Sequence, residues 1–217
     1  MKVDIYIPEA LNEITLEQYQ KFLKINTKEN ENSSFLLQKM VEIFCRLNLQ
    51  DIAKVKYSYV QEIAIHLNKI FDVKPDLIPV FEINNIEYGF IPNLDDITLG
   101  EYIDLDNTFG DWDKIHKAMA VLYRPIKFKK GNKYNIKDYE GAEGSSIMKQ
   151  APLDVVMGSM VFFYHLNSEL LTTTLNYLSK EMKTNLTTEQ KKTLEQNGVG
   201  INQFMDLVKE MLPSSIL

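Results

Sequence analysis

The sequence predicts a mainly α fold of the α+β class, a helical bundle around a long central helix with two small β-hairpins. Three observations support this class. Apolar residues recur at helical spacing through most of the chain, which indicates helices that bury one face. The segment after Pro152 is apolar on nearly all sides at its start, which is typical of a central helix. Two alternating apolar runs are interrupted by turn signals, Asn84-Asn85 and Gly131-Asn132.

The first 75 residues are predicted to form a helical unit. The expected elements are a short strand at 3–7 and helices at 16–25, 35–48 and 58–71. Ser58 with Gln61 has the spacing of a capping box, which would open the third of these helices. Pro75 and Pro79 then indicate a boundary, because proline interrupts regular structure. We therefore expect an N-terminal helical repeat over residues 1–75.

A second unit over residues 76–183 is predicted to hold both hairpins and the long helix. The expected elements are a hairpin at 80–90, helices at 99–105 and 112–123, a hairpin at 126–136 and a helix at 152–183. Pro125 ends the second helix, and Pro152 suits the first turn of the long one, where its missing N–H is not needed. Residues 184–217 are expected to form a C-terminal helical pair, with Thr187 and Gln190 as a further capping box.

One phrase occurs twice, as IPEALNEITLEQY at 7–19 and as IPNLDDITLGEY at 91–102. Both copies predict a capping box, formed by Thr15 with Gln18 and by Thr98 with Glu101. Both also predict a hydrophobic staple, formed by Ile14 with Tyr19 and by Ile97 with Tyr102. Two further blocks recur in the same order, at 39–46 with 117–124 and at 66–68 with 165–167. This order suggests an internal duplication, and the alternative is that such caps arose twice independently.

Composition narrows the classes of function. The net charge is −6, which argues against a general nucleic-acid binder, because such proteins carry a basic surface. The single cysteine, Cys45, excludes an internal disulfide and fits a reducing compartment. The first residues lack the apolar run of a signal peptide, and no apolar run is long enough to cross a bilayer. We expect a soluble protein without membrane contact.

No motif for catalysis or for a cofactor is visible. The chain has no phosphate-binding loop and no dinucleotide-binding fingerprint. His66, His116 and His165 lie far apart in the sequence, without ligand spacing or a cysteine cluster. We therefore expect no catalytic residue, cofactor or metal ion, and predict that the protein is not an enzyme. A cleft that gathers Asp104, His116 and Arg124 would favour the enzymatic alternative.

Charge is segregated along the second unit. Between residues 93 and 113 there are seven acidic residues and no basic one: Asp95, Asp96, Glu101, Asp104, Asp106, Asp111 and Asp113. Between residues 124 and 137 there are six basic residues and no acidic one: Arg124, Lys127, Lys129, Lys130, Lys133 and Lys137. The simpler interpretation is two solvated faces. The more specific one is a pair of complementary patches that meet between subunits of a ring. Contact of the basic hairpin with DNA phosphates is the less favoured alternative.

Four segments resemble poorly characterised morphogenesis proteins of tailed bacteriophages that infect Bacteroidetes, relatives of the crAss-like phages among them. The segments are FEINNIEYGFIPNLDDITLGEYIDLDN, HKAMAVLYRPI, YNIKDYEG and VFFYHLN. The resemblance covers about residues 80–180 and, in addition, the start of the first capped helix, IP…ITLEQYQKF. The resemblance implies a structural ring or tail component, or a tail assembly chaperone. It implies no catalytic residue.

The leading hypothesis is therefore a non-enzymatic phage protein that forms homo-oligomers and contacts other phage structural proteins, as a neck or tail component of the virion. One alternative is a tail assembly chaperone that holds the tape-measure protein in the host cytoplasm. Its expected contact residues are Phe204, Leu207, Met211 and Leu212, for which packing on the chain's own core is the simpler interpretation. A third hypothesis is a small phage regulator that binds a host protein through its acidic face.

Overall fold

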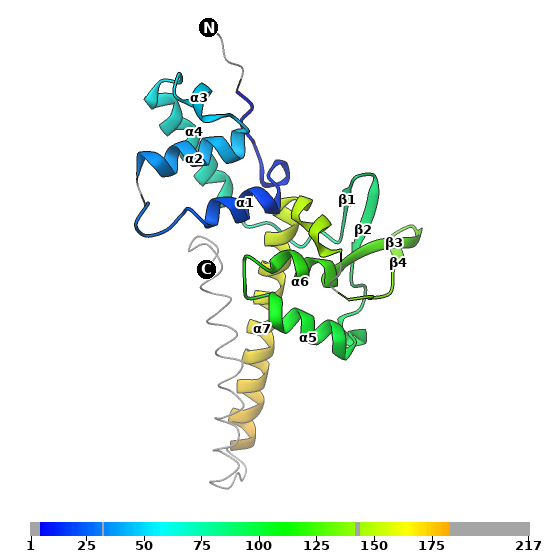
Figure 1. Ribbon diagram of the computed structural model, residues 1–217. Helices are drawn as coiled ribbons and strands as arrows, with labels where there is room; N and C mark the ends of the chain where they lie inside the picture. The colour runs from blue at the N-terminus through cyan, green and yellow to red at the C-terminus, as the bar shows by residue number, and fades with distance from the viewer. Residues whose placement is uncertain (1–4, 32, 142–143, 183–217) are drawn as a thin grey trace.

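The computed structural model describes residues 5–31, 33–141 and 144–182 (Figure 1). The N-terminal elements are η1 (Leu11–Glu13), α1 (Leu16–Leu23), α2 (Ser34–Cys45), α3 (Leu49–Ile52) and α4 (Tyr57–Phe71). The first hairpin and the helices after it are β1 (Val80–Ile83), β2 (Ile86–Phe90), η2 (Leu94–Asp96), α5 (Leu99–Thr108) and α6 (Ile115–Leu122). The remaining elements are β3 (Tyr123–Lys130), β4 (Lys133–Ile136), η3 (Ser145–Gln150) and α7 (Leu153–Met182).

Both predicted hairpins are present, and they join into one antiparallel sheet with the strand order β1-β2-β3-β4. Asn84 and Asn85 have φ values of 51° and 63°, which is the left-handed backbone that a tight hairpin turn requires. Gly131, with φ 60°, serves the turn between β3 and β4. The two hairpins meet where β2 pairs with β3, with Phe90 opposite Tyr123. The two hairpins therefore form one continuous sheet, and the second hairpin begins directly at the end of α6.

Two hydrophobic clusters form the core, and the start of α7 belongs to both. The sheet-side cluster takes most of its residues from the sheet, α6 and α7, including Val155, Val156 and Met160. The N-terminal cluster takes its residues from η1 to α4 and adds Leu153 and Met157 of α7. In Figure 1 the first turns of α7 accordingly lie between the N-terminal helices and the sheet. Leu16 of α1 also belongs to the sheet-side cluster, and the division into units of residues 1–75 and 76–183 stays a prediction.

The predicted bundle around a long central helix is wrong. The described chain is α+β, with helices packed around a four-stranded sheet. Although α7 is 30 residues long, its continuous burial ends at Met160, and the side chains whose burial is described after that residue are half-buried or exposed. In Figure 1 its later turns extend past the other described elements. The apolar start of this helix was interpreted as a feature of its whole length, whereas only the turns between the two clusters are enclosed.

Two smaller predictions are also wrong. Residues 5–7 form no strand, and residues 1–4 lie outside the described part. The helix expected to start at a Ser58 cap begins one residue earlier as α4, whose N-cap is Lys56 without a side-chain cap hydrogen bond. The predicted capping box of Thr187 and the helical pair at 184–217 lie outside the described residues.

The repeated phrase forms the same local structure twice. Both predicted capping boxes are confirmed, at Thr15 and at Thr98, and each follows a short 3-10 helix and precedes a second helix. Only the first copy buries its staple, because Ile14 and Tyr19 both belong to the N-terminal cluster. In the second copy Tyr102 is exposed, so the second staple is not buried and stays a prediction. The internal duplication stays a prediction.

Candidate interaction site

A buried ion pair joins α5 to β3. Arg124 Nη1 lies 2.8 Å from Glu101 Oε1, and only 13% and 4% of the two side chains are exposed. The other carboxylate oxygen of Glu101 accepts hydrogen bonds from the backbone N–H and the hydroxyl of Thr98, both at 2.7 Å. Glu101 therefore completes the capping box with one oxygen and holds Arg124 with the other. The acidic segment and the basic hairpin thus already meet within one chain.

Tyr139, in the segment after β4, closes this cluster. Its hydroxyl donates a hydrogen bond to Asp104 of α5, and its ring lies under the Arg124 guanidinium at 6.0 Å. Burial and the Asp104 carboxylate raise the pKa of Tyr139, so the hydroxyl keeps its proton and remains a donor. The arrangement fixes the outer helix α5 against the sheet. It is a tertiary clamp made of one ion pair and one hydrogen bond, in which the buried Arg124 Nε has no hydrogen-bond partner among the described residues.

His116 does not complete a catalytic group with Asp104 and Arg124. It lies on the buried face of α6, where its pKa is lowered by burial and by the charges of Lys149 and Lys117. Asp104 and Arg124 are brought together through Tyr139 instead. Among the described residues, no hydrogen bond or ion pair joins His116 to Asp104 or Arg124.

The lysines of the second hairpin fall into two sets. Lys127 pairs with Asp138 at 2.7 Å, and Lys129 pairs with Glu87 at 2.5 Å. Lys130 and Lys133 lie opposite each other at the end of the hairpin, next to the turn. These two ammonium groups, like that of Lys137, form no ion pair with any described residue. The end of the hairpin is consequently its positively charged part.

The acidic segment is also partly neutralised within the chain. Asp111 pairs with Lys114 at 2.9 Å, Asp113 pairs with Lys24 at 3.1 Å, and Asp96 accepts a hydrogen bond from the Asn93 amide at 2.9 Å. Asp95 and Asp106 are exposed and form no ion pair among the described residues. The exposed charge without an ion-pair partner among the described residues is thus that of Asp95, Asp96 and Asp106 on one side and of the hairpin end on the other.

The outer face of α5 carries a row of exposed apolar side chains. Leu99, Tyr102 and Ile103 are 74%, 61% and 47% exposed, and their spacing places them on one side of the helix. Asp106 continues this row one turn later. Sequence reasoning missed the row because it assigned Tyr102 to a staple. The signal that could have revealed it is Glu101: once this residue faces Arg124, its neighbour Tyr102 must face solvent.

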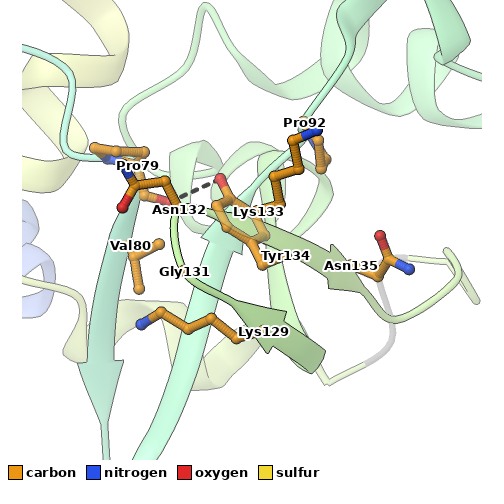
Figure 2. A pocket seen from close by; sticks show the side chains of 9 residues that line it. All are labelled: Pro79, Val80, Pro92, Lys129, Gly131, Asn132, Lys133, Tyr134 and Asn135. Carbon is orange, nitrogen blue, oxygen red and sulfur yellow. Dashed lines mark hydrogen bonds between the residues drawn. The ribbon is translucent and has the colours of Figure 1, made fainter.

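A hollow of about 660 Å³ lies between the second hairpin and the ends of β1 and β2. Figure 2 shows Tyr134 in its wall, with the hydroxyl directed to the Pro79 carbonyl at 3.2 Å. The Tyr134 ring lies over Gly89, where an added Cβ would come within 2.5 Å of it. The other lining residues are Val80, Pro92, Lys129, Gly131, Asn132, Lys133 and Asn135. The hollow is a gap beside a structural tyrosine, and its lining contains no carboxylate, histidine or cysteine.

The other side chains that could take part in chemistry, Cys45 and His66, lie in structural surroundings. Burial raises the pKa of the Cys45 thiol to about 11, so it stays protonated near neutral pH. The His66 ring nitrogen Nε2 lies 3.0 Å from the Pro8 carbonyl oxygen. Among the described residues no group of histidine, cysteine and carboxylate side chains is placed to hold a metal ion. Within the same part of the chain, no helix is both long enough and apolar enough to cross a membrane.

The predicted partner-binding residues Phe204, Leu207, Met211 and Leu212 lie outside the described residues. Comparisons of the chain with protein-family models, with curated proteins and with solved structures found no match. The function is therefore argued from the surface of α5 and the end of the second hairpin.

Proposed function

We propose that the protein is a non-enzymatic assembly protein of a tailed phage, which works through protein–protein contacts as a component of the neck or tail. The observation that carries this proposal is the outer face of α5, where Leu99, Tyr102 and Ile103 are exposed side by side. An apolar centre with a charged rim is the usual composition of a protein interface. The phage context rests on the resemblance of residues 80–180 to phage morphogenesis proteins.

The clamp beneath α5 supports the same proposal. A helix that serves as a contact surface must keep its position when the partner binds, and the Glu101–Arg124 pair and Tyr139 hold α5 on its inner side. Rigid support of an exposed aromatic residue favours binding, because little conformational entropy is then lost on association. Tyr102 is the side chain best placed to be an energetic centre of the contact, since tyrosine is enriched among such residues.

The test is to quantify the chain in purified particles of the phage that encodes it, by mass spectrometry and with an antibody. A neck or tail component is expected in particles at a fixed copy number. A tail assembly chaperone would instead be absent from particles and would copurify with the tape-measure protein. A regulator would copurify with one host protein. Either of these two results would overturn the proposal.

A matched pair of variants tests whether the outer face of α5 is the surface needed for incorporation into particles. Tyr102→Glu, supplied to a phage that lacks the wild-type gene, is expected to be excluded from particles. Tyr57→Glu is the control, because Tyr57 on α4 is 59% exposed and Tyr102 is 61% exposed. Equal incorporation of both variants would show that the outer face of α5 is not the assembly contact.

A further inference from the structure

We infer that the outer face of α5 binds the end of the β3–β4 hairpin of a second copy of this chain. This inference rests on the proposed function and names the partner of the same site. The α5 patch consists of Leu99, Tyr102, Ile103 and Asp106 of α5, together with Asp95 of η2, the short helix that precedes α5. The hairpin patch consists of Phe128, Lys130 and Lys133.

The hairpin patch matches the α5 patch in composition. Phe128 is among the exposed large apolar residues, and Lys130 lies two positions further along β3, on the same face of the strand. Lys133 of β4 is paired directly opposite Lys130 next to the turn, and its side chain also lines the hollow beside Tyr134. The patch therefore offers one aromatic ring and two ammonium groups. The α5 patch offers apolar side chains and two carboxylates.

The charges that remain for this contact have opposite sign. Lys127 and Lys129 are already paired with Asp138 and Glu87, and Glu101 is paired with Arg124. Each patch keeps two charges that have no ion-pair partner among the described residues. These charges are negative in the α5 patch and positive in the hairpin patch. Such complementary charge fixes the register of a contact and accelerates its formation.

A chain cannot make this contact with itself. Glu101 holds Arg124 on the inner side of α5, and Tyr102 and Ile103 lie about 100° and about 200° further around the helix. From Arg124 the strand leads away to Lys130, six residues and about 20 Å further along β3. Backbone pairing between β2 and β3 ends at Pro125, and beyond it the hairpin contacts β2 through the side chains of Lys129 and Tyr134. In Figure 1 the turn between β3 and β4 lies at the right-hand edge and α5 lies below the sheet.

The contact is heterologous, because the two patches are different surfaces of the same chain. Each copy then uses its α5 patch for one neighbour and its hairpin patch for another. Repetition of such a contact gives a closed ring or an open helical filament. A ring is the architecture expected of a phage neck component. The contact would weaken at high salt, since the paired charges at its rim are accessible to ions.

The test measures the mass of the purified full chain by light scattering, over a range of concentrations and at low and high salt. The wild type is expected to exceed the mass of one chain, more so at low salt. Tyr102→Glu alone, and Lys130→Glu with Lys133→Glu, are each expected to have the mass of one chain. Tyr57→Glu is expected to associate like the wild type. Circular dichroism checks that each variant is folded, which its exposed positions favour.

Mixing the two variants provides the decisive result. The Tyr102→Glu chain keeps an intact hairpin patch, and the hairpin variant keeps an intact α5 patch. A heterologous contact therefore predicts a one-to-one complex in the mixture, although neither variant associates alone. The inference is overturned if the mixture contains only single chains, if the hairpin variant alone keeps the wild-type mass, or if the wild type is a single chain at every concentration and salt.

The two proposals fail separately. A chain that is found in phage particles but stays single in solution would leave the proposed function standing and overturn this contact. A chain that forms the complex of the two variants but is absent from particles would support the contact and overturn the assignment to the virion.

Discussion

Removal of the Arg124 guanidinium should destabilise the fold more than any loss of a surface ion pair. In an Arg124→Met variant the Glu101 carboxylate, 4% exposed, would keep its negative charge without its partner. Breaking a buried ion pair typically costs about 3–5 kcal/mol. The lower end applies here, about 3 kcal/mol, because Thr98 still donates two hydrogen bonds to the carboxylate. For a chain of this size that is a fall in Tm of roughly 6–12 °C.

Urea unfolding would measure this loss, followed both by circular dichroism and by the fluorescence of Trp112, the single tryptophan. Trp112 packs against both hydrophobic clusters, so agreement of the two signals tests whether unfolding is two-state. Lys129→Met is the matched control in the same strand. Its pair with Glu87 is about 40% exposed, and surface pairs of this kind contribute at most about 1 kcal/mol.

A double variant separates the pair from the packing of the arginine stem. Adding Glu101→Gln to Arg124→Met removes the uncompensated charge and keeps an acceptor for Thr98, so part of the lost stability should return. The reasoning is refuted if Arg124→Met destabilises no more than Lys129→Met. It is also refuted if the double variant is less stable than Arg124→Met alone.

Two further predictions concern packing and pH. Gly158→Ala should destabilise the fold by about 1–3 kcal/mol, because its Cβ would lie 2.3 Å from the Asp76 carbonyl oxygen. At Gly100 an added Cβ would meet nothing within 4 Å, so Gly100→Ala should stabilise α5 by about 0.5–1 kcal/mol. The urea midpoints of the two variants should therefore shift in opposite directions, and a shift in the same direction would contradict this prediction. Because burial lowers the pKa of His116, the unfolded chain binds a proton below about pH 6.5 that the folded chain does not, so stability should fall as pH decreases from that value. His116→Asn should flatten this dependence, and an unchanged pH slope would show that another group causes it.

Local signals in the sequence predicted local structure well. The capping boxes at Thr15 and Thr98 and the turn at Asn84-Asn85 were predictable because each is decided by three or four neighbouring residues. The pairing of β2 with β3 was not predictable, because no local pattern brings Phe90 to Tyr123 across the intervening helices. That pairing converts two separate hairpins into a sheet. It is the main reason that the predicted helical bundle was wrong.

The candidate site was predictable only in part. Charge segregation in the sequence indicated the correct two elements, α5 and the second hairpin. It could not show which acid meets which base, because the pairing of Glu101 with Arg124 depends on how α5 lies against the sheet. The exposure of Tyr102 follows from that same packing. The residues around the two tyrosines follow the same pattern in both copies of the repeat. That pattern alone could not show that Tyr19 is buried and Tyr102 is exposed.

The two copies of the repeat differ at the third residue of the helix, where each reaches a different part of the fold. In the first copy the Gln18 amide donates to the Ile43 carbonyl at 2.7 Å and so ties α1 to α2. In the second copy Glu101 holds Arg124 and so ties α5 to β3. Either residue can complete a capping box, so the shared motif alone would allow the two to be exchanged.

The tertiary contacts predict that they cannot be exchanged. Gln18→Glu would replace the amide donor by a carboxylate facing a carbonyl oxygen, and Glu101→Gln would leave Arg124 without an anion. Each change should destabilise the fold by about 1–3 kcal/mol, although each keeps a residue suited to the capping box. Thr15→Ala and Thr98→Ala should each cost about 1 kcal/mol, because each removes the side-chain cap of its helix. If Gln18→Glu and Glu101→Gln leave the urea midpoint unchanged, the repeat is held by its caps alone and the third position carries no tertiary role.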